Sequence, residues 1–457
     1  MRSCERSRRP PQARRAPVSE AVQERALETA RPATPEPAST SEICRFLEGR
    51  TLFVTGATGF LAKLLVEKVL YEQPRVRKIY LLVRGGGSQE RARQRLEESL
   101  MGSALFDRLR AAHGAEYEEF MRSKLEAVDG SMEADGLGIA GAVRERLEDE
   151  VDVVVNSAAT TTFDERYDLA VGVNTLGAQR CLELARRCRR LRVLVHVSTA
   201  FTNGLREGHT RESLFEDGAT IKAEASTSSG RLDVDAEVAR AQGLGAAVRA
   251  RLRAAGMGEE EAEAAAEAAL RDEGMRAARE RGWQDTYVFT KAMGEMLVRR
   301  GAEAAGVPCC VVRPSIVESS YREPLPGWIE GIRMADPILL AYGKGQIAGF
   351  AADRDGVLDV VPADYVINAI LAAMPRHARG FGERPMSVYH VATSAAKPLT
   401  IRNFVDAVSR HFKREPFLNK DGSPVALRPM AVFPSSEAFI TYAQTNYLLP
   451  ALLAKLR

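Results

Sequence analysis

An apolar stretch, a glycine-rich turn and a helical pattern follow one another without interruption near the start of the chain. Residues 51–55 read Thr-Leu-Phe-Val-Thr, a composition typical of a buried strand. Residues 56–59 read Gly-Ala-Thr-Gly, and apolar side chains then recur at helical spacing over residues 60–71. A strand that turns directly into a helix through two glycines is the opening unit of a parallel βαβ structure. No other feature of the sequence restricts the fold as strongly.

The same alternation of apolar runs and helical patterns continues along the chain. The further strands that we predict are residues 78–83, 151–155, 193–197 and 309–312. The further helices that we predict are residues 174–190 and 286–304. Runs rich in β-branched residues and separated by helices indicate a parallel sheet, whose right-handed connections place helices on both faces. The predicted fold is α/β, a doubly wound parallel sheet of the Rossmann type.

The segments outside this alternation differ in composition. Residues 206–282 are rich in Ala, Glu and Arg, which predicts charged, exposed helices inserted into the fold. A strand at 387–392 and a helix at 400–412 indicate a second unit after about residue 375. The expected organisation is a leader over residues 1–45, a Rossmann-type domain over residues 46–375 that includes the insertion, and a small, incomplete C-terminal helical domain over residues 376–457.

The leader has an unusual charge balance. Residues 1–18 contain six Arg and one Glu among Ala, Pro and Ser. Apolar periodicity is absent, so this segment has no face that joins a hydrophobic core. Arg-rich, acid-poor composition is typical of an organelle transit peptide, and a featureless disordered tail is the alternative.

Charge and cysteine content exclude several classes of protein. The net charge of +3 lies largely in the leader, so it does not indicate a nucleic-acid partner. No stretch approaches the roughly 20 apolar residues that span a bilayer, so no transmembrane segment is expected. The six cysteines form no Cys-x-x-Cys pair and no His cluster accompanies them. We therefore expect neither a metal site nor a disulfide framework.

The glycine turn after the first strand has a chemical use. Gly56 and Gly59 allow a tight turn and a close approach of backbone to a pyrophosphate, and the helix that follows directs its free N–H groups at that group. The turn follows a predicted strand and opens a predicted helix, which is the context that a dinucleotide site requires. An ordinary turn is the alternative. The cofactor-binding residues predicted here are Thr55, Gly56, Thr58, Gly59, Phe60 and Leu61.

Arg84 follows the second predicted strand. An acidic side chain near this point binds the ribose hydroxyls of NAD, whereas an arginine suits the 2′-phosphate of NADP. We therefore expect NADPH rather than NADH as the cofactor, and a solvated surface arginine is the alternative.

Small residues follow the strand that ends near residue 155. Asn156 and Ala158 would let a cofactor lie over the strand end, and Asn174 would order the neighbouring backbone through its amide. Structural roles for both asparagines are equally consistent with the sequence.

Hydroxyl and phenol groups follow the later strands. Ser198 and Thr199 end the strand at 193–197, at the edge of the sheet where ligands bind in open α/β folds. Since neighbours on a strand point to opposite faces, only one of the two is expected to face a ligand.

Tyr287 and Lys291 stand at i and i+4, so a helix places both on one face. A nearby ammonium stabilises a phenolate, so we expect Lys291 to lower the pKa of Tyr287 and also to hold the nicotinamide ribose. A surface helix pair is the alternative.

Together these motifs resemble those of the extended short-chain dehydrogenases and, more narrowly, of the fatty acyl reductases that include the plant male-sterility proteins. The resemblance covers about residues 43–430 and includes the plastid branch of the family. It rests on residues 56–63, 197–201, 283–295, 313–316, 326–328, 342–345 and 359–364. Arg313, in the fourth of these segments, is counted among the expected cofactor-binding residues.

The resemblance implies an activity that composition and spacing do not. A long-chain fatty acyl thioester would be reduced with NADPH to an aldehyde and then to an alcohol. Thr199 and Tyr287 would hydrogen-bond the carbonyl, and Tyr287 would donate a proton. The carrier would be coenzyme A or acyl carrier protein, the latter in a plastid, with the cytoplasm as the alternative compartment. A non-reductive enzyme of the same fold, such as a sugar-nucleotide epimerase, and an inactive binding protein remain as other candidates.

Two departures from the family pattern stand out. Many relatives carry Gly-Asp where this chain has Gly130 and Ser131, so Asp129 is the expected substitute for a contact to the adenine ring. The C-terminal region diverges after about residue 430, which fits a shortened or truncated domain.

Overall fold

A computed structural model describes residues 41–206, 208–222, 231–380 and 384–448 of the chain. The leader that the sequence predicts lies outside the described residues up to residue 40. The folded part begins with helix α2 (Glu42–Leu47), whose Phe46 and Leu47 are buried in the main core. Residues 42–45 therefore belong to the fold rather than to the leader, whose expected boundary was residue 45.

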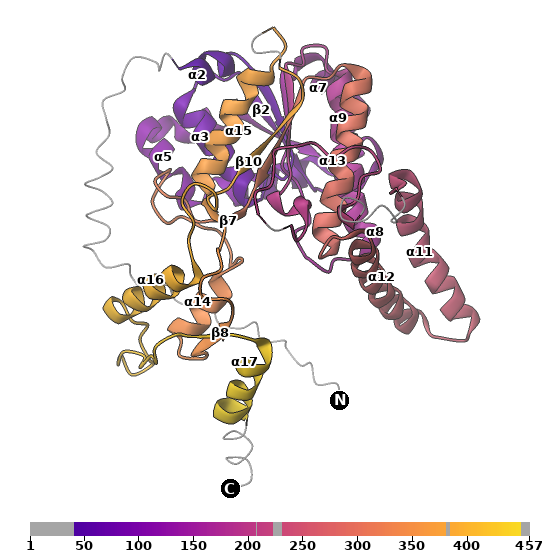
Figure 1. The fold of residues 1–457 in the computed structure, drawn as a ribbon. Helices are drawn as coiled ribbons and strands as arrows, with labels where there is room; N and C mark the ends of the chain where they lie inside the picture. The colour runs from indigo at the N-terminus through magenta and orange to yellow at the C-terminus, as the bar shows by residue number, and fades with distance from the viewer. Residues whose placement is uncertain (1–40, 207, 223–230, 381–383, 449–457) are drawn as a thin grey trace, which may run out of the picture. The chain divides into compact units, whose positions relative to one another are not determined.

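Seven strands form one parallel sheet, seen in the upper part of Figure 1. The order across the sheet is β10-β6-β5-β4-β1-β2-β3, and every neighbouring pair is parallel. From β1 the chain adds β2 and β3 on one side, and it then adds β4 on the other side of β1. Ligands bind at this change in strand order in such folds. The strands are β1 (Thr51–Val54), β2 (Lys78–Val83), β3 (Leu125–Asp129), β4 (Val153–Asn156), β5 (Val193–Val197), β6 (Cys309–Pro314) and β10 (Ser387–Val391). The predicted doubly wound fold is confirmed.

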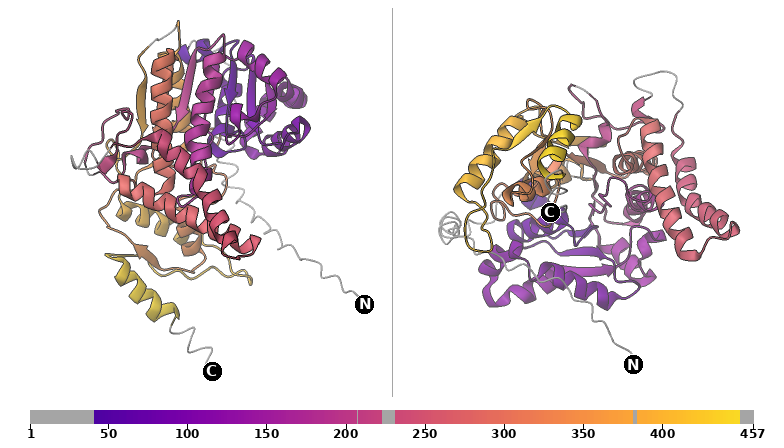
Figure 2. Two further views of the ribbon diagram at one scale, coloured as in Figure 1. Left: turned by 90° about the vertical axis from the view of Figure 1, so that its right-hand side faces the viewer. Right: turned by 90° about the horizontal axis from the view of Figure 1, so that it is seen from below.

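Helices cover both faces of this sheet because strand residues alternate between them. Leu52 and Val54 of β1 join one core, whereas Phe53 joins the other. The first core includes side chains from α2, α3 (Phe60–Glu72), α4 (Gln89–Leu100), α5 (Asp107–His113), α6 (Tyr117–Lys124) and α15 (Ala363–His377). The second includes side chains from α7 (Gly141–Glu150), α9 (Gly177–Arg187) and α13 (Thr286–Ala305). Figure 2 shows these layers from two further sides.

Shorter elements connect the layers. They are η1 (Ala104–Phe106), η2 (Gly114–Glu116), η3 (Asp135–Gly138), α8 (Tyr167–Ala170), the π-helix η4 (Val171–Leu176) and η5 (Ala200–Asn203). The helix predicted over residues 174–190 is thus formed as η4 continuing into α9.

The inserted segment forms two long helices, α11 (Val234–Ala254) and α12 (Glu259–Arg281), which pack side by side (Figure 1). The predicted helical insertion is confirmed, but the helices are not exposed all round. Small and apolar residues recur along one face of α12 and are buried, among them Ala262, Ala266 and Leu270. Leu270, Ala277 and Ala278 of this helix belong with Trp283 to a core that reaches α13. Alanines at this spacing bury a helix face without making the segment look hydrophobic.

The C-terminal part differs from the expected division. Strand β10, expected to begin a second unit, instead pairs with β6 at the edge of the main sheet. The expected boundary at residue 375 falls inside α15. The described residues, from Ser41 onward, belong to one compact unit.

A small module nevertheless lies below the sheet in Figure 1. Its residues come from the chain both before and after α15, so no single boundary in the sequence separates this module from the rest. Its core is Tyr342, Val405, Val408, Phe412 and Met430. Its elements are α14 (Asp336–Gly343), β8 (Gly349–Ala351), α16 (Ile401–Arg414), β11 (Ala431–Phe433), α17 (Ser436–Ala443) and the π-helix η6 (Gln444–Leu448), and the pair β7 (Ile316–Glu318) and β9 (Val360–Pro362) connects it to the sheet.

Candidate active site

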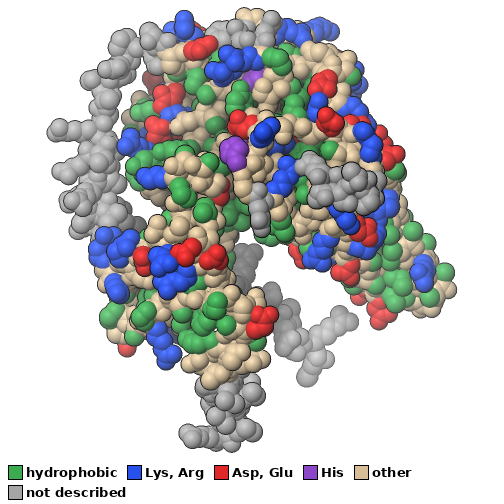
Figure 3. All heavy atoms as spheres, viewed as in Figure 1, with side chains coloured by type: hydrophobic (Ala, Val, Ile, Leu, Met, Phe, Trp, Pro, Cys, Tyr) green, Lys and Arg blue, Asp and Glu red, His purple; other side chains and the backbone are tan. Residues whose placement is uncertain are grey.

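A cleft of about 880 Å³ runs along the carboxyl edge of the sheet. It is lined by the residues that follow β1, β2, β3, β4, β5 and β6, together with the start of α13. Figure 3 shows the molecular surface open between the C-terminal module and the helical insertion, below this edge. The structure brings eleven sequence-predicted residues together here: Gly56, Thr58, Gly59, Phe60, Leu61, Arg84, Ala158, Ser198, Thr199, Tyr287 and Lys291.

The glycine turn forms a cradle in the floor of the cleft. Gly56 has a φ of +73°, and a Cβ atom there would lie 3.0 Å from the Cα of Ala158. Its carbonyl accepts a hydrogen bond from the N–H of Gly59 at 2.8 Å. Gly59 precedes α3 and offers no side chain to cap the helix, so the first N–H groups of α3 are left for a ligand. This is the geometry that binds a pyrophosphate.

Thr55 and Asn156, expected at the cofactor, instead lie buried behind the cradle and outside the cleft lining. The Thr55 hydroxyl donates to the Asn156 side-chain oxygen at 2.8 Å and accepts from the N–H groups of Ser157 and Ala158 at 3.1 and 3.0 Å. The Asn156 amide in turn contacts Nδ1 of the buried His196 at 3.1 Å. Their hydrogen bonds fix the turn after β4 against β1, so they support the cradle rather than line it.

Two arginines mark the far end of the cleft. Arg84 follows β2, as predicted, and is exposed. Arg95 of α4 lines the cleft beside it and donates to the Arg84 carbonyl. The sequence reasoning missed Arg95, which stands on a charged helix face like many surface arginines. Asp129 does not replace the missing adenine contact, because its carboxylate accepts from the Gly85 N–H at 2.7 Å and it does not line the cleft. Ser131 lines it instead.

Ser198 and Thr199 both line the cleft. The expectation that only one of them faces a ligand is wrong, because β5 ends at Val197 and the strict alternation of a strand ends with it. Thr199 caps η5, where its Oγ1 accepts from the Phe201 N–H at 3.3 Å. The buried Ser198 hydroxyl has no hydrogen-bond partner in the described part of the chain, so it is available to a ligand.

Tyr287 and Lys291 lie on the first turns of α13. Asp285 caps this helix by accepting from the Val288 N–H at 2.9 Å. Tyr287 faces the cleft, with the ring of Phe163 centred 6.3 Å from its own. Lys291 is 1% exposed, and its Nζ donates to the Val197 carbonyl at 2.6 Å. The pair is thus anchored to the end of β5, next to Ser198.

The electrostatics of the pair differ from expectation. Burial raises the pKa of Tyr287, and the nearby Asp285 carboxylate raises it further, against a hydrogen bond with Thr199. Lys291 was expected to lower this pKa, but its ammonium is directed at a backbone carbonyl instead. Burial lowers the pKa of Lys291 to about 8, against the opposing effect of Glu295. The phenol therefore keeps its proton at neutral pH, which suits a proton donor.

Arg313 and Asn174 are structural. Arg313, expected at the cofactor, is fully buried in an ion pair with Glu295, its Nε lying 2.9 Å from a carboxylate oxygen, and it does not line the cleft. This pair joins β6 to α13. The Asn174 amide donates to the Thr160 carbonyl and to the Thr290 hydroxyl, both at 3.1 Å.

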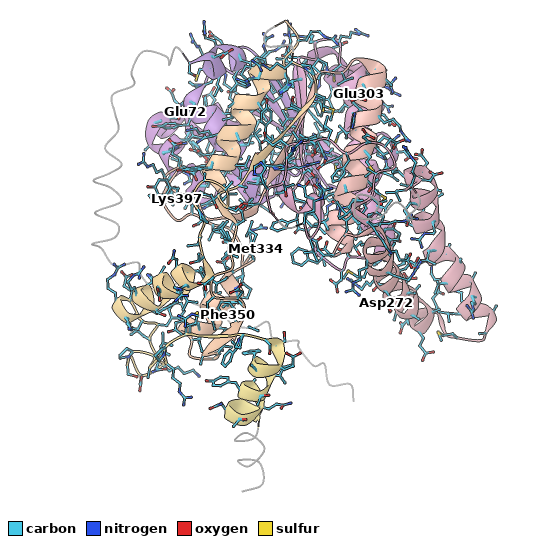
Figure 4. The ribbon with its side chains drawn as sticks, viewed as in Figure 1. Glu72, Asp272, Glu303, Met334, Phe350 and Lys397 are labelled. Carbon is cyan, nitrogen blue, oxygen red and sulfur yellow. The ribbon has the colours of Figure 1, made fainter. Side chains whose placement is uncertain are left out.

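Four exposed apolar side chains that were not among the predicted site residues also line the cleft. Phe163, Phe201, Ile332 and Met334 are 49%, 37%, 67% and 48% exposed. They come from three distant parts of the chain, with Ile332 and Met334 on one segment and Phe201 in η5, so no periodicity connects them in the sequence. Figure 4 labels Met334, on the chain between β7 and α14, where it lies between the sheet and the C-terminal module. We call these four residues the apolar rim.

Two classes of feature are absent from the part of the chain that the structure describes. No group of three His, Cys, Asp or Glu side chains there is arranged to hold a metal ion. None of the helices described is both long enough and apolar enough to cross a membrane.

The parallel sheet, the glycine cradle and the Tyr-Lys helix define a nicotinamide-dependent enzyme fold of the extended short-chain dehydrogenase class. The chain matches the family model described as Male sterility protein, an NAD-binding domain, over residues 54–370. It belongs to that family.

Curated relatives share most of the chain. Fatty acyl-CoA reductase 2, chloroplastic, from Arabidopsis thaliana is 43% identical over 401 residues, which are 87% of this chain and 63% of that protein. The alcohol-forming fatty acyl-CoA reductase of Simmondsia chinensis is 38% identical, over 89% of this chain and 80% of that protein. Fatty acyl-CoA reductase 1 of Arabidopsis thaliana is 37% identical, over 91% and 81%. The chain thus spans less than two thirds of the first relative's length and about four fifths of the other two.

Solved structures confirm the fold. The reductase domain of a nonribosomal peptide synthetase from Mycobacterium tuberculosis superposes with a TM-score of 0.55 at 20% identity, covering 92% of this chain and 79% of that one. The terminal reductase domain of the myxalamid pathway gives a TM-score of 0.54 at 19% identity, covering 90% and 78%.

Proposed function

We propose that this protein is an NADPH-dependent reductase that converts long-chain fatty acyl thioesters to fatty alcohols through an aldehyde. The observation that carries the proposal is the meeting of the glycine cradle and Tyr287 in one cleft. The names of relatives that are 37–43% identical over most of the chain support the substrate class and the alcohol product.

The residues at the cofactor end fit an anionic dinucleotide. Gly56 leaves space that a Cβ atom would fill, and the start of α3 presents uncapped N–H groups. Arg84 and Arg95 add two exposed guanidinium groups at the adenosine end, which favours the 2′-phosphate of NADPH over the bare ribose of NADH. When bound, the nicotinamide supplies a hydride to the substrate carbonyl carbon.

The residues at the other end act on the carbonyl oxygen. Tyr287 keeps its proton, so it donates a hydrogen bond to the oxygen as negative charge develops there. The unpartnered hydroxyl of Ser198, or Thr199 beside it, supplies a second donor. Lys291 holds the nicotinamide ribose, and its charge stabilises the developing oxyanion. The first oxyanion collapses, which breaks the carbon–sulfur bond, releases the thiol of the carrier and leaves the aldehyde. In the second reduction Tyr287 passes its proton to the alkoxide and yields the alcohol.

The apolar rim supports a long acyl chain as the substrate. Phe163 lies against Tyr287, so an acyl chain whose carbonyl reaches the phenol would pass it. Exposed apolar side chains around a cleft are costly in water and are stabilised when an apolar ligand covers them.

The test is an assay of the purified chain with palmitoyl thioesters and NADPH. Fatty alcohol, identified by mass spectrometry, is expected together with oxidised cofactor. A sugar-nucleotide epimerase would return its cofactor unchanged, and an inactive binding protein would leave both reagents intact. Either outcome from a folded sample would remove the reductase proposal.

The carrier and the compartment form a second part of the proposal. We infer that residues 1 to about 40 direct the chain to plastids and are then removed, and that acyl carrier protein thioesters are preferred to coenzyme A thioesters. Support comes from the six arginines in residues 1–18 and from a relative named as chloroplastic. A fluorescent fusion of residues 1–45 should enter chloroplasts, and acyl carrier protein substrates should win in direct competition. A cytosolic fusion or a preference for coenzyme A contradicts this part and leaves the reductase assignment in place.

A further inference from the structure

One segment from outside the main sheet contributes residues to the lining of the cleft. Residues 320–336, between β7 and α14, pack against α3, the helix that begins at the glycine cradle. The ring of Trp328 stacks on that of Phe60, with centroids 5.2 Å apart and planes 18° from parallel. Lys63 of α3 is buried, and its Nζ lies 2.6 Å from a carboxylate oxygen of Glu330. The 320–336 segment is therefore fixed to the first turns of α3.

A second set of contacts fixes the start of the segment. Asp364 accepts hydrogen bonds from the N–H groups of Tyr321 and Arg322 at 2.8 and 3.0 Å. Glu323 forms ion pairs with Lys68 and with Arg108. The segment is thus held at two places along α3. The residues that follow Glu330 continue from these contacts into the lining of the cleft.

Arg333 is the charged residue that this segment places in the lining of the cleft. Its guanidinium carbon lies 5.2 Å above the Phe60 ring, at the first residue of α3. Its Nε donates to the Glu330 carbonyl at 2.7 Å, and its backbone N–H donates to Asp336 at 2.8 Å. Arg333 lines the cleft together with Gly56 and Gly59.

Within the described part of the chain, only Nε of this guanidinium donates a hydrogen bond, and neither outer nitrogen has a partner. Among the described residues, no carboxylate lies within ion-pair distance of Arg333, in contrast to the buried Arg313, which pairs with Glu295. Stacking on Phe60 and the bond from Nε hold the plane of the group and leave both Nη atoms free to donate. A fixed planar fork with two free donors is the arrangement that binds phosphate oxygens.

We propose that Arg333 binds the pyrophosphate of the nicotinamide cofactor, opposite the start of α3. The N–H groups of the helix and the Nη groups of Arg333 then approach the same anion from two sides. The inference rests on the cofactor part of the proposed function. The same phosphate chemistry occurs in the pantetheine arm of an acyl thioester, so the experiment is designed to separate the two sources.

The first arm measures cofactor binding by fluorescence titration without any acyl substrate. Arg333→Ala should weaken NADPH and NADH by the same factor, about tenfold or more, because both carry the pyrophosphate. Arg84→Ala should weaken NADPH alone, because NADH lacks the 2′-phosphate. Arg322→Ala is the matched control, since Arg322 lies on the same segment over the Tyr321 ring but does not line the cleft, and it should leave both dissociation constants unchanged.

The second arm separates the sources and guards against misfolding. Arg333→Lys keeps the charge without the planar fork, so it should fold as the parent does and bind both cofactors with intermediate affinity. If Arg333→Ala instead leaves both cofactor dissociation constants within twofold and raises only the KM of the acyl thioester, the phosphate belongs to the substrate and the proposal is overturned. No change in either quantity overturns it as well. Alcohol formation by the parent enzyme is unaffected by these outcomes, so the proposed function is judged separately.

Discussion

The two ends of the cleft are built in opposite ways. The nucleotide end consists of turns that follow β1, β2 and β4 within residues 55–160, together with Arg333 from the 320–336 segment, and its cradle offers mainly backbone groups. The reacting end assembles the end of β5, the start of α13 and the apolar side chains of Phe163, Ile332 and Met334, and it offers a substrate mainly side chains. Backbone cradles depend on glycine and tolerate little change, whereas a rim of exposed side chains can be altered without disturbing the fold. The comparison predicts that substitutions at the nucleotide end weaken cofactor binding, whereas substitutions at the reacting end lower turnover or raise the KM of the substrate.

The largest effect is expected at the reacting end. Tyr287→Phe removes the phenol and keeps the ring that packs near Phe163. Turnover should fall by roughly 100-fold or more, because general acid catalysis is lost. The dissociation constant for NADPH should stay within about twofold, since the cradle is untouched. Steady-state kinetics and a fluorescence titration measure the two quantities, and unchanged turnover would remove Tyr287 from the mechanism.

At the nucleotide end, a substitution should weaken the binding of NADPH rather than lower turnover. In Gly56→Ala the new Cβ lies 3.0 Å from the Ala158 backbone, at a φ of +73°. We expect NADPH binding to weaken by about tenfold or more because the cradle must shift to relieve this contact, whereas the roughly 1–2 kcal/mol cost of a left-handed alanine lowers the stability of the fold with or without cofactor. Gly49→Ala is the matched control, with a φ of +66° and no atom within 4 Å of its Cβ. Equal losses of affinity in the two variants would show that the contact with Ala158 does not matter.

A smaller effect is expected at the apolar rim. Ile332→Ser should raise the KM for palmitoyl thioesters by about fivefold, as roughly 1 kcal/mol of apolar contact is lost. The kinetics of a short acyl thioester, which does not reach the rim, should not change. Leu205→Ser is the control, because Leu205 is 81% exposed but does not line the cleft. If both chain lengths respond equally, the rim does not contact the acyl chain.

The smallest effect is a pH dependence at Lys291, where the two ends meet. Its pKa is lowered to about 8 by burial, so the ammonium is present below pH 8 and is lost as the pH rises through that value. The kcat/KM for NADPH should therefore be halved near pH 8 and fall further above it. Lys291→Arg stays charged and should show no decline in this range. A flat wild-type profile between pH 7 and 9 would contradict the assignment.

The same contrast explains what could be predicted from the sequence. Gly56, Gly59 and Arg84 follow predicted strands directly, so the nucleotide end is visible as local motifs. Tyr287 and Lys291 were identifiable because helical spacing brings them to one face. Phe163 and Met334 line the same cleft only because the chain folds, and nothing local to either residue signals this.

The errors have physical causes as well. Strand β3, Leu-Glu-Ala-Val-Asp, lies at the sheet edge with polar residues between apolar ones, so it was not predicted. Strand β10 was assigned to a separate unit because its partner β6 lies far away in the sequence. Arg313 and Asn156 carry the groups that bind cofactors, but burial turns those groups toward Glu295 and Thr55. Residue type alone does not separate a ligand contact from an internal one.

The central claim is that both ends of the cleft act on one carbonyl carbon. The most direct measurement uses NADPH with deuterium at both C4 positions, a palmitoyl thioester and the purified chain, followed by mass spectrometry of the product. The account predicts hexadecanol with two deuterium atoms, both on C1, because each reduction delivers one hydride from the cofactor. Unlabelled alcohol, or oxidation of the cofactor without a label on C1, would contradict it.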